Sequence, residues 1–99
     1  MASFLLVHGA WHGAWAWDRV KPLLAAAGHN VVAPDLPRST LEANVACALA
    51  AVAHCPPPLI VVGHSLAGMT VTALAEQIPG RIARLVYLAA FLPKSGQSV

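Results

Sequence analysis

The sequence is poor in charge, in cysteine and in long apolar runs. Only 10% of its 99 residues are charged, and the formal net charge is +2. The six basic residues are scattered and form neither a run nor a stripe, which argues against nucleic acid or a membrane surface as a partner. The longest unbroken apolar run, residues 45–53, is far shorter than the ~18 residues of a membrane span, so no such span is predicted.

The two cysteines are too few and too far apart for a disulfide framework. Cys47 and Cys55 stand eight positions apart in one predicted helix and its end, a rise of about 12 Å, whereas bridged Cα atoms lie within about 7 Å. We expect free thiols or small buried side chains, as in a reducing compartment. The apolar residues 4–7 have no basic leader, so no secretory signal is predicted and a cytoplasmic location is expected.

Apolar residues, by contrast, are abundant. They make up 58% of the chain, and the mean hydropathy is +0.65. A chain of this length forms one small domain, residues 1–99, and buries roughly two-thirds of the surface that its unfolded form exposes. The apolar content exceeds what a free-standing domain of this size needs.

Short apolar runs alternate with segments of helical periodicity. The predicted strands cover residues 3–7, 30–34, 59–62 and 84–91, and the predicted helices cover about 18–27, 39–55 and 66–78. Buried strands joined by helical crossovers indicate an α/β fold, a parallel sheet with helices on both faces.

The ends and apolar faces of the first two helices can also be predicted. The first begins at an Asp18 N-cap and stops at Gly28, and the second begins with a capping box from Ser39 to Glu42. Their apolar faces are Val20, Leu23, Leu24 and Ala27 in the first helix, and Leu41, Val45, Leu49 and Val52 in the second.

Residues 59–69 are typical of a strand that turns sharply into a helix with a serine at the turn. The apolar run ends at Gly63, Ser65 follows two residues later, and small residues come soon after it. A serine held on such a turn is exposed above the edge of the sheet, where its hydroxyl can attack a carbonyl carbon. The alternative is a glycine-rich turn in which the serine is incidental.

Attack on an ester or amide carbonyl also requires oxyanion donors and a base. The expected donors are the backbone amides of Leu66, at the start of the helix, and of Ala10, in the loop after the first strand. The base is harder to find. His64 adjoins Ser65 in a turn that directs neighbouring side chains apart, and His8 is interpreted as shaping the loop, with a surrogate base as the alternative.

The remaining histidines, acids and tryptophans fit structural roles. At predicted helix ends, a solvated or capping imidazole is expected for His29 and His54. None of the acids is placed to orient a histidine; they are Asp18, Asp35, Glu42 and Glu76. The tryptophans are interpreted as packing the loop and first helix onto the sheet, with a share in an acyl pocket as the alternative; they are Trp11, Trp15 and Trp17.

Two segments resemble the α/β-hydrolase superfamily: Val-His-Gly-Ala-Trp-His-Gly-Ala-Trp at residues 7–15, and Val-Gly-His-Ser-Leu-Ala-Gly-Met at residues 62–69. The chain is most similar to the small branch of plant methylesterases, hydroxynitrile lyases and bacterial carboxylesterase-like proteins. The resemblance implies a partial α/β-hydrolase fold of four strands and three helices. It also implies Ser65 as the nucleophile, with the amides of Ala10 and Leu66 as the oxyanion hole.

The chain departs from the family pattern in three ways. Ala67 replaces the second glycine of G-x-S-x-G, and the loop at residues 35–40 is short. In the family the acid and the histidine follow the serine in later strands, so residues 1–99 are interpreted as a truncated domain without the cap and the C-terminal strands. The strand at 84–91 would then be an exposed edge open to self-association, with Leu85, Tyr87 and Phe91 short of helical cover.

The resemblance implies a serine-dependent hydrolase whose partner is a small carboxylic ester. Two alternatives stay open: a hydroxynitrile lyase-like enzyme, and a catalytically incomplete fragment or pseudoenzyme that lacks the triad acid and histidine. No cofactor or metal is predicted, because no dinucleotide or P-loop motif and no metal-ligand spacing is present.

Overall fold

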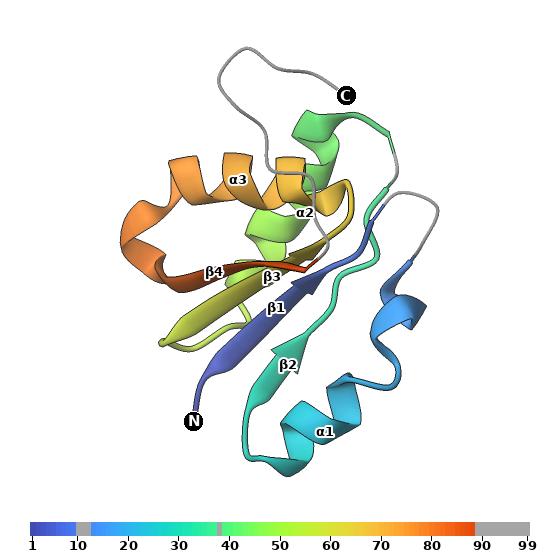
Figure 1. The fold of residues 1–99 in the computed structure, drawn as a ribbon. Helices are drawn as coiled ribbons and strands as arrows, with labels where there is room; N and C mark the ends of the chain where they lie inside the picture. The colour runs from blue at the N-terminus through green and yellow to red at the C-terminus, as the bar shows by residue number, and fades with distance from the viewer. Residues whose placement is uncertain (10–12, 38, 89–99) are drawn as a thin grey trace.

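Four parallel strands form the centre of the computed structural model, which describes residues 1–9, 13–37 and 39–88 (Figure 1). The order across the sheet is β2-β1-β3-β4, with β1 (Ser3–Val7), β2 (Asn30–Val32), β3 (Leu59–His64) and β4 (Ile82–Leu88). The helices are α1 (Lys21–Ala26), α2 (Leu41–Val52) and α3 (Ala67–Gln77), with 3-10 turns η1 (Ala14–Trp17) and η2 (Pro79–Arg81). The predicted parallel α/β sheet with helices on both faces is confirmed.

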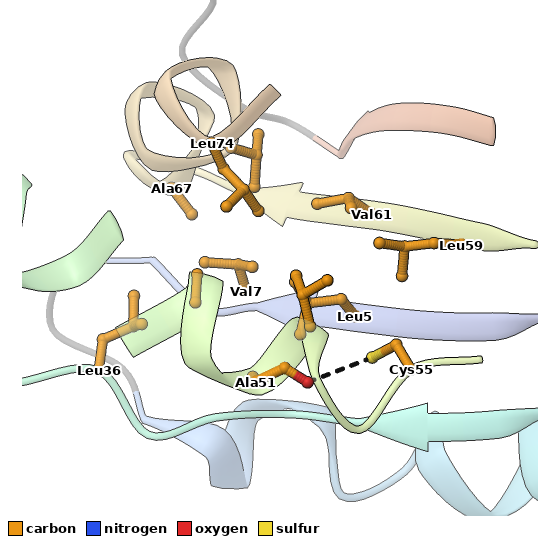
Figure 2. Packing of buried hydrophobic residues seen from close by; sticks show 12 residues of the cluster. Leu5, Val7, Leu36, Ala51, Cys55, Leu59, Val61, Ala67 and Leu74 are labelled. Carbon is orange, nitrogen blue, oxygen red and sulfur yellow. Dashed lines mark hydrogen bonds between the residues drawn. The ribbon is translucent and has the colours of Figure 1, made fainter. Parts of the chain in front are cut away.

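The core lies between the two central strands and the pair of helices α2 and α3. Leu5 and Val7 of β1 and Leu59 and Val61 of β3 are fully buried, and Figure 2 shows them gathered with side chains of α2 and α3. Alternation along β1 places Leu6, also buried, on the opposite face. Burial on both faces explains why the central strands are continuous apolar runs.

Helix α2 begins one residue later than predicted. Its N-cap is Thr40, whose Oγ1 accepts a hydrogen bond from the Ala43 amide at 3.0 Å, so the Ser39 capping box is wrong. Both residues can cap, and the helix takes the one that meets the amide three positions on. Its buried face includes Ala48 and Ala51 as well as two of the predicted valines. No described helix is long and apolar enough to cross a bilayer.

Helix α1 is shorter than predicted and differently placed. Asp18 does not cap it; the chain first forms η1, and α1 follows with Val20 as N-cap and no side-chain cap. The predicted apolar face is not buried by the described residues, and Leu23 is 72% exposed. The predicted stop at Gly28 is confirmed by its φ of 91°, a backbone conformation that favours glycine.

Strand β4 is one of the two outer strands of the described sheet, at the edge opposite β2. Leu85 and Tyr87 face the core cluster, so the prediction that they lack cover is wrong; Phe91 lies outside the described residues. The exposed apolar side chains are Val86 (40%) and Leu88 (51%), which alternation places on the other face. In the part of the chain that the structure describes, the outer edge of β4 therefore has no pairing strand and lies beside two exposed apolar side chains.

Both described cysteines are free thiols, as predicted. Cys55 is buried in the core, where its Sγ–H donates to the Ala51 carbonyl at 3.5 Å (Figure 2). Burial raises the pKa of the Cys55 thiol, and the Arg81 guanidinium nearby offsets part of that rise. Cys47 is half-buried and faces the carbonyl of Asp35.

Candidate active site

Ser65 stands on a strained turn between β3 and α3. Its φ of 58° lies in the left-handed region, where a residue other than glycine costs on the order of 1–3 kcal/mol. The surrounding hydrogen bonds hold this conformation: Gly68 N–H donates to the Ser65 carbonyl at 3.1 Å, and Ser65 N–H donates to the Leu88 carbonyl at 3.4 Å. A strand, a strained serine and a helix thus follow one another as the sequence predicted.

Gly63 allows helix α3 to approach the strand closely. A Cβ at this position would lie 2.8 Å from Val71 Cγ2 and 3.2 Å from the Ala67 carbonyl oxygen, so any larger residue would push α3 away. The Ala67 methyl group, at the position of the family's second glycine, is itself buried in the core cluster. The departure from glycine at residue 67 is therefore accommodated.

Gly9 packs directly against the Ser65 turn. The strands β1 and β3 are neighbours, with Val7 paired to Gly63, so the segments that follow them leave the sheet side by side. A Cβ on Gly9 would lie 2.9 Å from Ser65 Cβ, 3.0 Å from the His64 carbonyl oxygen and 3.4 Å from Ser65 Oγ. Only glycine lets the backbone after β1 come this close to the serine.

Only one of the two predicted oxyanion donors, the amide of Leu66, lies within the described residues. Leu66 is the N-cap of α3, with helical backbone angles of φ −61° and ψ −16°. Among the described residues its amide has no backbone acceptor, and it lies at the helix end where the positive potential of the helix dipole is strongest. Ala10, the other predicted donor, lies outside the described residues.

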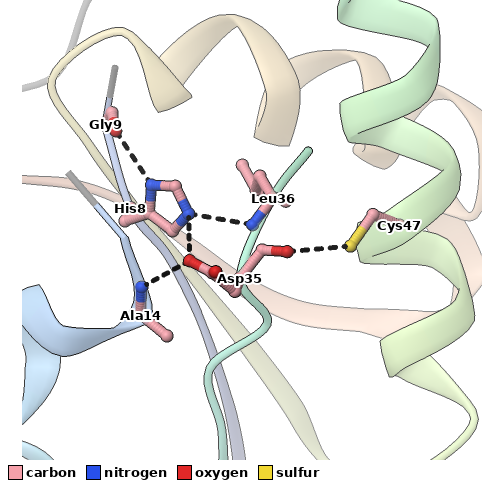
Figure 3. A network of polar contacts seen from close by, with 6 residues as sticks. All are labelled: His8, Gly9, Ala14, Asp35, Leu36 and Cys47. Carbon is pink, nitrogen blue, oxygen red and sulfur yellow. Dashed lines mark hydrogen bonds and ion pairs between the residues drawn. The ribbon is translucent and has the colours of Figure 1, made fainter. Parts of the chain in front are cut away.

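His8 is fixed in one neutral tautomer by two backbone partners (Figure 3). Its Nδ1 lies 2.9 Å from the Gly9 carbonyl oxygen, and its Nε2 lies 2.9 Å from the Leu36 nitrogen. A carbonyl can only accept and an amide can only donate, so Nδ1 carries the hydrogen and Nε2 the lone pair. The ring is 2% exposed and both nitrogens are used. These contacts agree with the interpretation of His8 as a loop-shaping residue.

Asp35 contacts both His8 and the backbone at Ala14. Its Oδ1 accepts a hydrogen bond from the Ala14 amide at 3.1 Å and lies 3.6 Å from His8 Nε2 (Figure 3). Because the lone pair of Nε2 already receives the nearer Leu36 amide, the imidazole is neutral and this longer contact is not an ion pair. Asp35 and Leu36, adjacent in sequence, thus anchor the chain at Ala14 and at His8.

One described contact of the His64 side chain is with a tryptophan. The His64 ring meets Trp17 edge to face, with centroids 6.3 Å apart, and Trp17 is buried. Trp17 thus packs as interpreted, whereas Trp15 is 59% exposed. Trp11 and the second loop histidine, His12, lie outside the described residues.

The other predicted titratable residues have the following surroundings. His29 accepts the Ala2 amide at 3.0 Å through Nδ1 and meets Phe4 edge to face, at the amino end of the sheet, so a solvated or capping role is wrong for it. His54 is exposed beyond the end of α2. Asp18, Glu42 and Glu76 are exposed.

Sequence reasoning missed the two backbone anchors, Leu36 and Ala14. Both act through their amide hydrogens, which every residue but proline carries, so no side-chain pattern could have indicated them. In the described part of the chain, no group of three histidine, cysteine or acidic side chains could hold a metal ion.

These features define an α/β hydrolase, and comparison confirms it. Residues 4–98 match the sequence model of the Alpha/beta hydrolase family, and the chain belongs to this family. The chain is 39% identical to "Carbendazim hydrolyzing esterase" of Nocardioides sp. (strain SG-4G), over 100% of its own length and 46% of that protein. It is 39% identical to "Alpha-hydroxynitrile lyase" of Arabidopsis thaliana, over 91% of its own length and 40% of that protein.

Solved structures agree. The crystal structure of polyneuridine aldehyde esterase matches 99% of this chain and 44% of that one, with 34% identity and a TM-score of 0.87. Methylesterases of Arabidopsis thaliana are also among the relatives, which confirms the predicted methylesterase-like branch. The chain spans less than half the length of these relatives.

Proposed function

We propose that this chain carries the nucleophile and the oxyanion hole of a serine-dependent hydrolase of small carboxylic esters. One observation carries the proposal: Ser65 is held at φ 58° between a strand and a helix, with Gly9 packed against its Cβ. A strained serine at the start of a helix is costly, and such strain is found where the side chain must be presented to a ligand. The esterases among the relatives support an ester as substrate.

In this proposal the Ser65 oxygen attacks the ester carbonyl carbon, its proton passes to a base from outside the described residues, and the carbonyl oxygen becomes an oxyanion. Collapse of the oxyanion breaks the ester C–O bond, so the alcohol leaves with a proton and an acyl-serine remains for water to hydrolyse. The amide of Leu66 donates to the oxyanion, together with the amide of Ala10, which the sequence assigns. The first turn of α3 adds the positive end of its dipole. Loss of one such donor lowers the rate by about 10²–10³-fold.

The base and its acid partner are expected from outside the described residues. Both ring nitrogens of His8 have backbone partners, and His64 packs on Trp17. Without a base, the remaining oxyanion hole would still give about 10³–10⁴-fold over water. The chain is thus expected to react with an activated electrophile even where its turnover of esters is slow.

A fluorophosphonate probe tests the proposal, because its phosphorus reacts with a serine oxygen to give a tetrahedral adduct with an oxygen in the oxyanion site. We expect one adduct, on Ser65, located by peptide mass spectrometry and lost in Ser65→Ala. Ser39→Ala is the matched control, since Ser39 is an exposed serine outside the turn. Absence of a Ser65 adduct would instead support the catalytically incomplete fragment or pseudoenzyme.

A hydroxynitrile lyase-like activity is the second candidate, favoured by the identity to the Arabidopsis lyase over 91% of the chain. The same serine and loop would then serve carbon–carbon cleavage. Release of cyanide from mandelonitrile, compared with hydrolysis of p-nitrophenyl acetate by the same preparation, separates the two. Ester hydrolysis without cyanide release is expected.

A further inference from the structure

The hydroxyl groups of Thr72 and Tyr87 meet between helix α3 and strand β4. Their oxygens lie 2.6 Å apart, and Thr72 Oγ1 also lies 2.7 Å from the carbonyl oxygen of Gly68, one turn earlier in the helix. A threonine hydroxyl has one hydrogen and a carbonyl can only accept, so Thr72 donates to Gly68. Tyr87 must then donate to Thr72. The two side chains thus form a directed chain of hydrogen bonds from β4 to the first turn of α3.

Both ends of this chain of hydrogen bonds lie beside the Ser65 turn. Leu88, the residue after Tyr87 in β4, accepts the Ser65 amide through its carbonyl. Gly68, whose carbonyl accepts the Thr72 hydroxyl, donates its own amide to the Ser65 carbonyl at 3.1 Å. The amide and the carbonyl of Ser65 are therefore bonded to the two segments that Tyr87 and Thr72 join.

The left-handed backbone of Ser65 needs support of this kind. A strained conformation persists only where the surrounding contacts over-determine it. The Leu88 carbonyl oxygen lies 3.4 Å from the Ser65 nitrogen, beyond the roughly 2.7–3.2 Å of most such bonds, so this main-chain link from β4 is weak. The bond between Tyr87 and Thr72 is shorter, and the Tyr87 ring packs against the core cluster, which limits the access of competing water.

We propose that Thr72 and Tyr87 are positioning residues for attack by Ser65: their hydrogen bond holds the first turn of α3 against β4, and with it the backbone of the strained serine. The inference rests on the proposed function, because it concerns the same nucleophile. It goes further in giving a role to two hydroxyl groups that no step of the proposed reaction uses.

Substitutions can remove this hydrogen bond while the packing stays nearly the same. Tyr87→Phe removes one hydroxyl and keeps the ring, Thr72→Val removes both bonds of Thr72, and Thr72→Ser keeps them. Ser3→Ala is the matched control, because the buried Ser3 hydroxyl donates to the Pro56 carbonyl at the amino end of the sheet, opposite the serine turn. It also loses one side-chain hydrogen bond, so it reports the effect of destabilisation alone.

We expect the fluorophosphonate labelling rate of Ser65 to fall about fivefold in Tyr87→Phe, the change in the population of the held turn that one net hydrogen bond supports. Thr72→Ser and Ser3→Ala should label nearly as fast as the parent protein. The double variant of Tyr87→Phe and Thr72→Val should label no more slowly than Thr72→Val, because both substitutions remove the same bond. Labelling of Tyr87→Phe at the parent rate, or equal slowing in Ser3→Ala, would overturn the positioning role.

Hydrogen exchange of the Gly68 amide gives a readout independent of reactivity, because this amide donates to the Ser65 carbonyl. Under native conditions, where it exchanges by local opening, it should exchange about fivefold faster in Tyr87→Phe and at the parent rate in Ser3→Ala. Faster exchange without slower labelling would make the pair structural and overturn the positioning role while leaving the proposed function intact. A parent protein that does not react at Ser65 would overturn the proposed function, and the positioning role with it.

Discussion

The contact between Gly9 and Ser65 can be tested by adding a single methyl group. In Gly9→Ala the new Cβ would lie 2.9 Å from Ser65 Cβ and 3.0 Å from the His64 carbonyl oxygen. Carbon atoms in contact prefer at least about 3.5 Å, so the backbone must move by about 0.6 Å. Neither neighbour is the end of a flexible side chain. The φ of Gly9 is not positive, so steric contact is the cause of any change.

The displacement sets the size of the effect. Overpacking of this kind costs about 1–3 kcal/mol of stability, and a shift approaching 1 Å beside the reacting oxygen lowers the rate by up to about 10²-fold. Gly80→Ala is the matched control, because no atom lies within 4 Å of a Cβ at that position. Both variants remove similar freedom from the unfolded chain, so that contribution cancels in the comparison.

Two measurements decide the outcome. The rate of fluorophosphonate labelling at Ser65, followed by intact mass, reports on the site, and urea unfolding reports on stability. We expect Gly9→Ala to lower both the labelling rate and the free energy of unfolding, and Gly80→Ala to lower neither. A Gly9→Ala protein that labels and unfolds like Gly80→Ala would refute the close approach of the two segments.

Three further predictions concern the rest of the fold. Because the pKa of the Cys55 thiol is raised in the native state, the native thiol keeps its proton to higher pH than the unfolded one. Its contribution to stability is complete below the ordinary thiol pKa of 9.0 and is lost as the pH rises further. Cys55→Ala should therefore flatten the alkaline limb of a curve of unfolding free energy against pH. Tyr87→Phe removes the 2.6 Å hydrogen bond to Thr72 and should cost about 1 kcal/mol in urea unfolding. We propose that the chain self-associates through the free edge of β4, so Val86→Lys should lower its sedimentation coefficient toward that of a monomer, and a monomeric parent would contradict this.

Much of the fold was predictable because strands and turns are encoded locally. The apolar run before His8 ends where β1 ends, and β2 stops at Val32, short of the predicted end at Pro34, a residue that cannot donate to the ladder. The strand β3 continues to His64, beyond the predicted end, because the turn begins only at Ser65. Each of these differences is of two residues, and both leave the topology unchanged.

The burial of helix faces was less predictable. Val20 and Leu23 have helical spacing, but burial depends on what covers them, and α1 contacts mainly the edge strand β2. The two adjacent cap-forming residues, Ser39 and Thr40, both have a plausible partner three positions on, and only the path of the chain into α2 decides between them. Periodicity fixes which residues share a face and not whether a neighbour exists.

The candidate site likewise has one part that is encoded locally and one part that depends on a residue distant in sequence. The turn at Ser65 depends on contiguous residues and on one neighbouring glycine, so a single sequence motif for each segment was enough to predict it. The tautomer of His8 depends on the amide of Leu36, which is distant in sequence and carries no side-chain signature. The turn that carries the serine is encoded locally, whereas the buried histidine of the neighbouring segment is held by a contact that is distant in sequence. Substitutions at the turn should therefore abolish reaction at Ser65, whereas substitutions at His8 should lower its rate only in part.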